Sequence, residues 1–147
     1  MRVASIEGAA RRATSEDLEA VLALDAVSPV GHTRGPLLTM RVQSGEVIIY
    51  EYLGQLSGYA VVRSRSFFGR DFVELLAVAP NEQRRGIGSL LLQRAVGWSS
   101  TDRIFTSTNQ SNVAMIGLLG KEDWRFSGQL EGIDEGDPEI VFYKNSQ

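Results

Sequence analysis

Hydrophobic positions change their spacing several times along the chain, and each change predicts a different element. Apolar residues follow helical spacing behind a polar start with acids in its first turn, which predicts a helix over residues 15–27. Pro36 is suited to open a second, short helix that ends near Gly45. Residues 2–12, before the first helix, have a weak strand pattern. The N-terminal part is therefore expected to contribute one strand and two helices.

The middle of the chain is rich in β-branched and aromatic residues, which favour strands. Two such runs, over residues 47–52 and 56–67, are separated by a short turn and predict a hairpin. A third run over residues 72–78 follows a second turn and ends before Pro80. This third run is nearly all apolar and contains one carboxylate, Glu74. Together the three runs predict a meander of strands.

The spacing becomes helical again further along the chain. Five apolar positions fall on one helix face: Ile87, Leu90, Leu91, Ala95 and Trp98. A short strand over residues 104–106, a helix over 112–121 and two strands over 126–131 and 139–144 follow. The order β-α-α-β-β-β-α-β-α-β-β holds one strand–helix–strand unit inside an antiparallel run. We therefore expect an α/β fold, of the α+β kind, built on a mixed sheet.

Nothing in the sequence separates domains. It contains no internal repeat, no low-complexity stretch and no linker rich in Pro, Gly or Ser. Its 147 residues are close to the common domain size, so we expect a single domain over residues 1–147. The chain also lacks an apolar leader and any apolar run of the ~20 residues that span a bilayer. We expect a cytoplasmic protein without a membrane partner.

The inventory of reactive side chains excludes several classes of chemistry. The chain has no cysteine, which excludes disulfides, thiolate metal sites and a cysteine nucleophile. Its one histidine, His32, cannot complete a His/Cys zinc site and is expected on a surface loop, so no metal is expected. The net charge of −3 gives no general attraction to nucleic acid, and no nucleic-acid partner is expected.

The segment after the third run of strands combines basic residues, glycines and a helix start. Gly86 and Gly88 have no side chain to obstruct a phosphate, and Arg84 and Arg85 add positive charge. Backbone N–H groups at a helix start lack partners and favour anions. This arrangement indicates a cradle for a pyrophosphate. It is not a dinucleotide loop, because Leu91 stands where the third glycine is needed, and no P-loop lysine follows either glycine.

The six residues Gln83-Arg84-Arg85-Gly86-Ile87-Gly88 are similar to the Q/R-x-x-G-x-G/A motif of the GNAT acetyltransferase superfamily. The resemblance extends to the strand before this motif, the helix after it and the helix that begins at Asn112. The chain as a whole resembles a bacterial-type member of that family. The resemblance implies acetyl-CoA as co-substrate, no metal, and direct attack of a small-molecule or peptide amine on the thioester. Two alternatives remain open: a non-catalytic acyl-CoA-binding or regulatory module, and a protein or peptide N-acetyltransferase.

The resemblance also assigns residues to the cofactor. The pantetheine arm would pair with strand backbone before the loop and with an asparagine at the start of the later helix. The pyrophosphate would lie on the amides of the loop and of the first helical turn. The implied cofactor-binding residues are Leu76, Ala77, Val78, Gln83, Arg84, Arg85, Gly86, Ile87, Gly88, Ser89 and Asn112.

Acetyl transfer needs a base for the amine and a proton or other stabilisation for the leaving thiolate. Glu74 is the candidate base, because a carboxylate among apolar neighbours is suited to the role and its position resembles that of the glutamate in polyamine-acetylating members. The alternative for Glu74 is an ion pair with an arginine across the sheet. Leu119 stands where many members have a tyrosine acid. The proton donor is then Ser107, Tyr143 or water, or the thiolate leaves unassisted.

Three further stretches have two interpretations each. The polar residues 106–112 line the acceptor or cofactor site, or form a loop that caps a helix. The five acids within residues 131–139 attract a cationic amine, or form a solvated loop. Phe67 and Phe68 pack at a turn, or bound the acceptor mouth or a homodimer contact. Asp123-Trp124 replaces the family's Gly-Phe, which we interpret as a change in packing.

Overall fold

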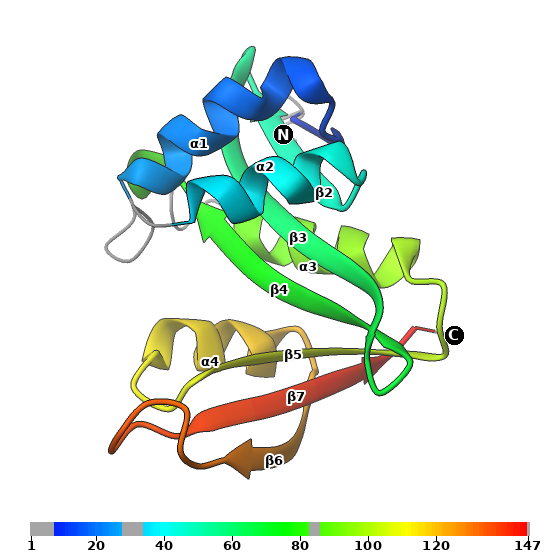
Figure 1. The fold of residues 1–147 in the computed structure, drawn as a ribbon, viewed down its shortest axis with the longest axis vertical. Helices are drawn as coiled ribbons and strands as arrows, with labels where there is room; N and C mark the ends of the chain where they lie inside the picture. The colour runs from blue at the N-terminus through cyan, green and yellow to red at the C-terminus, as the bar shows by residue number, and fades with distance from the viewer. Residues whose placement is uncertain (1–7, 28–33, 83–85, 147) are drawn as a thin grey trace, which may run out of the picture. The chain divides into compact units, whose positions relative to one another are not determined.

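The computed structural model describes residues 8–27, 34–82 and 86–146, and the order of its helices and strands is the predicted one (Figure 1). Its elements are β1 (Ala9–Arg12), η2 (Ser15–Asp17), α1 (Leu18–Ala26), α2 (Gly35–Gln43), β2 (Val47–Tyr52), β3 (Gln55–Phe67), β4 (Arg70–Val78), η3 (Pro80–Glu82), α3 (Ile87–Trp98), β5 (Arg103–Asn109), α4 (Val113–Lys121), β6 (Arg125–Leu130) and β7 (Glu139–Asn145). No described helix is long and apolar enough to cross a bilayer.

The seven strands of the described residues have the order β1-β2-β3-β4-β5-β7-β6. β1 and β2, β2 and β3, β5 and β7, and β6 and β7 pair antiparallel. β4 and β5 pair in parallel, with Asp71–Val73 opposite Ile104–Thr106, and α3 connects them in the chain. The expected α/β fold with a mixed sheet is confirmed, and the parallel pair is the strand–helix–strand unit of the sequence pattern.

The first helix and the strand β5 depart most from the sequence prediction, and the other described elements differ from it by one or two residues at their ends. The first helix starts with the 3₁₀ turn η2, where Thr14 and Asp17 form a capping box. β5 is longer than the predicted 104–106, because the polar residues 107–109 pair along β7. Their backbone groups make ladder hydrogen bonds whatever their side chains are, so a polar stretch that predicts a loop can continue a strand. Residues 2–7 of the predicted first strand lie outside the described residues.

The chain forms two compact units, and each is described by itself. Unit 1 contains residues 1–62 and 75–91, and unit 2 contains residues 63–74 and 92–147. In unit 1, α1 and α2 cover one face of β2 and β3 (Figure 1). Their shared core consists of Ala13, Val21, Leu24, Leu38, Val42, Val47, Ile49, Tyr59 and Val61. Leu75 and Ala77 of β4 pack against this core.

A buried polar cluster joins α1, α2 and β3 inside unit 1. The Tyr59 hydroxyl donates a 2.5 Å hydrogen bond to Asp25 Oδ1, and Arg34 Nη2 lies 2.6 Å from the same oxygen. Tyr59 and Asp25 are almost fully buried. Burial and the adjacent Asp25 carboxylate raise the pKa of Tyr59 far above its usual value, so the phenol keeps its proton. The cluster ties the end of α1 to the residue that precedes α2.

In unit 2, α4 lies along one side of β5, β7 and β6 (Figure 1). Ile104, Thr106 and Thr108 alternate as buried residues along β5, and Leu119 of α4 is fully buried. At the start of this unit's parallel pair lies a second buried carboxylate, Asp71. It accepts hydrogen bonds from the amides of Arg65 (2.9 Å) and Ser100 (2.8 Å).

The environment of Asp71 has opposing effects on its charge. Burial raises the pKa of this carboxyl, but the hydrogen bonds from Ser100, Arg65 and Ser99 outweigh burial, and the net result is a pKa below the usual value. Asp71 therefore carries its charge at neutral pH. It joins the adjoining ends of β3 and β4 to the residues between α3 and β5.

Candidate functional site

The first part of the candidate site lies in unit 1, where β4 leads into α3. Gly86 has φ +81°, a left-handed conformation that favours glycine, and a side chain there would meet open space. Its carbonyl accepts a 3.0 Å hydrogen bond from the Leu90 amide, which closes the first turn of α3. Gln83, Arg84 and Arg85 of the predicted cradle lie outside the described residues.

Close packing fixes the start of α3 in unit 1. A Cβ on Gly58 of β3 would lie 2.9 Å from the carbonyl oxygen of Ala77 and 3.1 Å from side-chain carbons of Ile87 and Leu91. Ile87 and Leu91 are buried. Gly58 therefore lets β3, β4 and the first turns of α3 approach each other closely, and the amides of those turns are held in place.

The first turn of α3 offers several donors to an anion. Helix geometry leaves its first N–H groups, those of Ile87, Gly88 and Ser89, without intrahelical acceptors, and the helix dipole adds positive potential there. The Ser89 hydroxyl is buried and has no hydrogen-bond partner among the described residues. A buried donor of this kind needs an acceptor. This donor set fits a phosphate group, as the cradle predicted.

The strand residues Leu76, Ala77 and Val78 form the end of β4 in unit 1, and all are partly buried. The amide of Ala79, directly after the strand, donates 2.8 Å to the Ser57 carbonyl and anchors this end to β3. Parallel pairing of β4 with β5 ends earlier, at Val73–Thr106. The three residues thus lie beyond the last β4–β5 pair.

Glu74 follows directly on that last pair and belongs to unit 2. Its Oε2 lies 3.9 Å from Arg63 Nη1 on β3, an ion-pair distance but longer than a hydrogen bond. The Glu74 side chain is 24% exposed and that of Arg63 is 35% exposed, so both are reached by water. The arginine partner considered from the sequence is present. A carboxylate that water reaches can take up a proton through that water.

Ser107 and Tyr143, the two candidate proton donors, lie on neighbouring strands of unit 2. Ser107 is opposite Val141, and Tyr143 is opposite Phe105. The two pairs are two residues apart on each strand, so their side chains lie on the same face of the sheet. The Ser107 hydroxyl donates a 2.7 Å hydrogen bond to Glu139 Oε2. Sequence reasoning placed Glu139 in the acidic run but did not connect it to Ser107.

The ring of Tyr143 is held in an aromatic environment. Its centroid lies 5.7 Å from that of Phe105, and the Arg103 guanidinium lies 5.1 Å from the ring centre. The structure therefore gives the two candidate donors different surroundings, a carboxylate for Ser107 and a tilted aromatic ring with a guanidinium for Tyr143.

Asn112 begins α4 in unit 2 and uses both ends of its side chain. Its Oδ1 accepts from the Met115 amide at 3.1 Å, and its Nδ2 donates to Thr108 Oγ1 at 3.1 Å. The capping interpretation of this asparagine is confirmed. The amide nitrogen carries two N–H groups, and the bond to Thr108 uses one of them.

Leu119 and the residues after α4 are packing positions. Leu119 is fully buried, so this side chain belongs to the core. Asp123 has φ +63°, a conformation typical of glycine after a helix that aspartate tolerates. The Trp124 amide donates 2.9 Å to the Leu119 carbonyl, and Trp124 is buried. His32 lies outside the described residues.

A model of the acetyltransferase (GNAT) family matches residues 15–121. The structure is similar to a GNAT-family acetyltransferase from Bacillus cereus, with 31% identity, a TM-score of 0.89 and coverage of 95% of this chain and 97% of that chain. No curated protein matches the chain.

Two further solved structures are similar. One is a ribosomal-protein-alanine N-acetyltransferase from Brucella melitensis, with 26% identity, a TM-score of 0.73 and coverage of 93% of this chain and 99% of that chain. The other, from Salmonella typhimurium, contains its cofactor acetyl-CoA and has 20% identity, a TM-score of 0.73 and coverage of 96% and 95%. At 20% identity, the second likeness concerns the fold alone.

Proposed function

The chain belongs to the GNAT acetyltransferase family, and on that premise we propose that it transfers the acetyl group of acetyl-CoA to a primary amine by direct attack on the thioester. The observation that carries the proposal is the start of α3. There Gly86 adopts φ +81° and the Ser89 hydroxyl lacks an acceptor among the described residues. These features suit the pyrophosphate of coenzyme A.

We assign the binding of acetyl-CoA to the residues that the family resemblance implies. The amides of residues 84–89 hold the pyrophosphate, with Gln83, Arg84 and Arg85 contributed by the loop. The backbone of Leu76, Ala77 and Val78 pairs with the pantetheine arm, and Asn112 donates to it. Acetyl-CoA brings the activated acetyl group. The protein positions the thioester next to the amine and transfers the protons.

The reaction needs one bond made and one broken. The neutral amine nitrogen attacks the thioester carbonyl carbon, the C–N bond forms, and the C–S bond breaks to release coenzyme A as the thiolate. The proton lost by the nitrogen passes to Glu74 through a water molecule, since this side chain is partly exposed. Backbone near Val78 polarises the carbonyl. Ser107, Tyr143 or water returns a proton to the thiolate.

Two measurements on the purified chain test this function. Acetyl-CoA should raise the melting temperature, and release of free thiol from acetyl-CoA should accelerate with one or more amines of a panel that includes small amines and peptides. Glu74→Gln should lower kcat by about 100-fold or more while melting is still raised by acetyl-CoA. Glu51→Gln is the matched control, because Glu51 is also a strand glutamate paired with an arginine, at 3.0 Å from Arg11.

Each alternative gives a distinct result. A chain that acetyl-CoA does not stabilise would remove both the enzyme and the acyl-CoA-binding module. Stabilisation without thiol release across the panel would leave the module. A Glu74→Gln rate equal to wild type would remove Glu74 from the base role, and Ser107→Ala and Tyr143→Phe then show by their rates whether either hydroxyl protonates the thiolate.

A further inference from the structure

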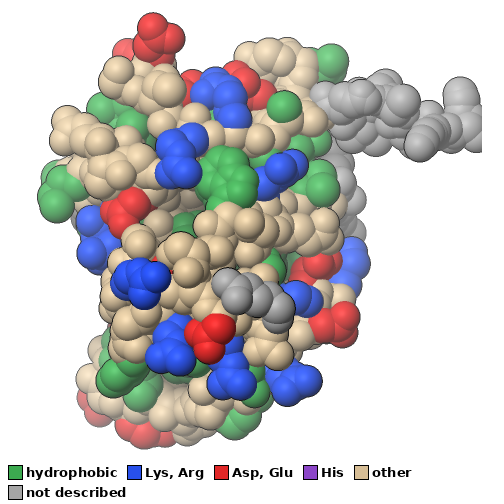
Figure 2. All heavy atoms as spheres, turned by 90° about the vertical axis from the view of Figure 1, so that its right-hand side faces the viewer, with side chains coloured by type: hydrophobic (Ala, Val, Ile, Leu, Met, Phe, Trp, Pro, Cys, Tyr) green, Lys and Arg blue, Asp and Glu red, His purple; other side chains and the backbone are tan. Residues whose placement is uncertain are grey.

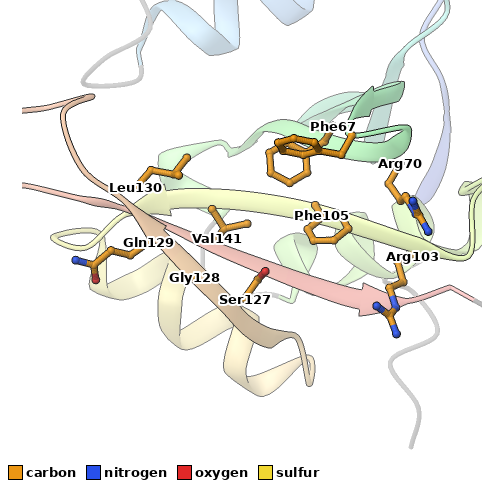
Figure 3. A pocket seen from close by; sticks show the side chains of 10 residues that line it. Phe67, Arg70, Arg103, Phe105, Ser127, Gly128, Gln129, Leu130 and Val141 are labelled. Carbon is orange, nitrogen blue, oxygen red and sulfur yellow. The ribbon is translucent and has the colours of Figure 1, made fainter.

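A hollow opens on unit 2, on the face of β5 and β7 that carries Phe105 and Val141 (Figure 3). Its volume is about 480 Å³, which lies in the range of small-molecule sites. Every residue that lines it belongs to unit 2, and none of them is assigned to acetyl transfer above.

Aromatic and aliphatic side chains form the walls of this hollow. Phe67 stacks on Phe72 at a centroid distance of 5.0 Å and lies tilted against Phe105 at 5.1 Å. Phe68 is 88% exposed and Leu130 is 45% exposed, so both present apolar surface to water. A flat apolar group that enters the hollow would remove this surface from water and pack against the rings.

Two arginines lie at one end of the hollow, and each already has a partner. Arg70 Nε lies 3.1 Å from Asp102 Oδ1, and Arg103 Nε donates a 3.1 Å hydrogen bond to Asn145 Oδ1. Figure 2 shows Lys and Arg side chains gathered at the level where Figure 1 places the C-terminus and the β3–β4 turn. No carboxylate among the described residues lines the hollow. The hollow itself therefore offers nothing that would hold an ammonium group.

The opposite end of the hollow, at Leu130, meets the hydrogen-bonded pair of Ser107 and Glu139 (Figure 3). Leu130 on β6 is opposite Glu139 on β7. Val141, which lines the hollow, is opposite Ser107 on β5. Side chains two residues apart on a strand share a face, so Ser107 and Glu139 lie on the face that carries the hollow.

The hydrogen bond between Ser107 and Glu139 decides which groups remain for a ligand. Ser107 donates its hydroxyl proton to Glu139 Oε2 at 2.7 Å. An ionised carboxylate only accepts, so the proton of Ser107 is used and its oxygen keeps lone pairs for an outside donor. In the part of the chain that the structure describes, no lysine or arginine forms an ion pair with Glu139. The pair therefore suits a cationic N–H donor, such as a protonated amine.

The proposed base lies on the strand next to this pair. Glu74 on β4 and Ser107 on β5 each come directly after Val73–Thr106, the last pair of the parallel register. Glu74, Ser107 and Glu139 thus lie on three successive strands of the sheet, β4, β5 and β7. An amine held at Ser107 is close to the strand whose carboxylate is proposed to take its proton.

We propose that the acceptor is a monoamine with one flat apolar group, whose ammonium binds at Ser107 and Glu139 and whose apolar group fills the hollow. The inference rests on the proposed acetyl transfer and adds its substrate class. The ammonium donates to the Ser107 oxygen, and Glu139 is a positioning residue that orients this hydroxyl and adds negative charge. The proton for the thiolate then comes from Tyr143 or water. A polyamine fits less well, because no carboxylate lines the hollow to meet its further charges.

The first test compares amines that share only part of this chemistry. Isothermal titration calorimetry, with coenzyme A in excess, gives the dissociation constant of each probe. The probes are 2-phenylethylamine, ethylamine without the ring, 2-phenylethanol without the charge, and spermidine with further charges. The chain should bind 2-phenylethylamine about 10-fold more tightly than each of the other three.

The second test removes the apolar contact and uses a control of matched geometry. Phe68 and Leu53 are exposed turn residues with φ +51° and +54°. Phe68→Ala should weaken binding of 2-phenylethylamine about 10-fold and leave that of ethylamine unchanged, because only the ring reaches the hollow. Leu53→Ala should bind both amines as the wild type does.

The third test removes the charge at the amine. Glu139→Gln should weaken binding of both 2-phenylethylamine and ethylamine about 10-fold and leave that of 2-phenylethanol unchanged. Glu135→Gln is the control, because Glu135 is an exposed acid of the same β6–β7 connection. In the thiol-release assay, Glu139→Gln should raise KM for the amine while kcat and KM for acetyl-CoA stay as in the wild type, a split that general damage to the fold would not give.

Each outcome decides the proposal. Equal binding of 2-phenylethylamine and ethylamine would overturn it, as would tighter binding of spermidine or wild-type binding by Phe68→Ala or Glu139→Gln. Binding as predicted without acetylated product would support the site and overturn acetyl transfer. Acetylation of other amines or peptides, with 2-phenylethylamine neither bound nor acetylated, would support acetyl transfer and overturn the site.

Discussion

Thr106 on β5 donates a 2.9 Å hydrogen bond from its hydroxyl to the carbonyl oxygen of Val73 on β4. These two residues are also the last pair of the parallel β4–β5 register, and Glu74 comes directly after it. The Thr106 side chain is almost fully buried. The bond therefore fixes the last residue pair of the parallel β4–β5 pairing. Glu74, the proposed base, is the next residue of β4.

Replacing Thr106 with valine keeps the shape of the side chain and removes this bond. Loss of a buried hydrogen bond should lower the free energy of unfolding by about 1–2 kcal/mol, measured by urea denaturation. Thr39→Val is the control, because Thr39 Oγ1 donates to the Gly35 carbonyl within α2 and serves no strand pair. Equal stability of Thr106→Val and wild type would contradict the assigned role of the bond.

A methyl group at position 58 should disturb the start of α3. Gly58→Ala places a Cβ 2.9 Å from the Ala77 carbonyl oxygen, which should cost roughly 1–3 kcal/mol of stability. Because the same atoms position the proposed cradle, KM for acetyl-CoA should rise more than kcat falls. Gly97→Ala is the matched control, since a Cβ there meets nothing within 4 Å. A Gly58→Ala enzyme with normal stability and KM would show that the close approach is not needed.

The carboxylate of Asp25 supports two partners in unit 1. Asp25→Ala leaves the Tyr59 hydroxyl and the Arg34 guanidinium without it, and removal of one member of a buried ion pair costs about 3–5 kcal/mol. Tyr59→Phe removes one hydrogen bond and should cost only ~1 kcal/mol. Thermal and urea denaturation of the two variants check this ranking. Equal losses would contradict a role for Asp25 as the shared acceptor.

Stability should fall in acid because of Asp17. The hydrogen bond from Arg11 lowers the pKa of Asp17 from 3.8 to about 2. A carboxyl whose pKa is lower in the folded state stabilises the fold above its unfolded pKa and loses that contribution as pH falls. The loss should occur between about pH 4 and pH 2 and amount to ~1 kcal/mol, because Arg11 is partly exposed and solvent screens the pair.

Two variants isolate this effect. Asp17→Asn should flatten the dependence of the urea midpoint on pH in that window and lower stability at neutral pH. Glu16→Gln, at the exposed neighbouring position, should leave the curve as in the wild type. Superimposable curves for Asp17→Asn and wild type would contradict the Arg11–Asp17 contribution.

Features that depend on residues close together in the chain could be predicted from the sequence. The order of elements follows from hydrophobic spacing, and the glycines at 86 and 88 indicate the cradle before any fold is known. Asn112 is expected as a cap from its position before an apolar helix, and its Oδ1 does cap α4.

Contacts that join distant segments could not be predicted in this way. The bond between Asp25 and Tyr59 spans 34 positions, and that between Ser107 and Glu139 spans 32. No periodicity specifies which polar residues meet across a sheet, because register depends on the packing of whole strands. For the same reason the polar end of β5 is a strand although its composition predicts a loop.

The central claim is acetyl transfer to an amine with Glu74 as the base. The most direct measurement incubates the chain with acetyl-CoA labelled in its acetyl group and with the amine panel, and detects labelled amide by mass spectrometry. We predict a labelled amine that forms about 100-fold more slowly with Glu74→Gln and at the wild-type rate with Glu51→Gln. Formation of no labelled amine by a chain that acetyl-CoA stabilises, or equal rates for wild type and Glu74→Gln, would contradict the account.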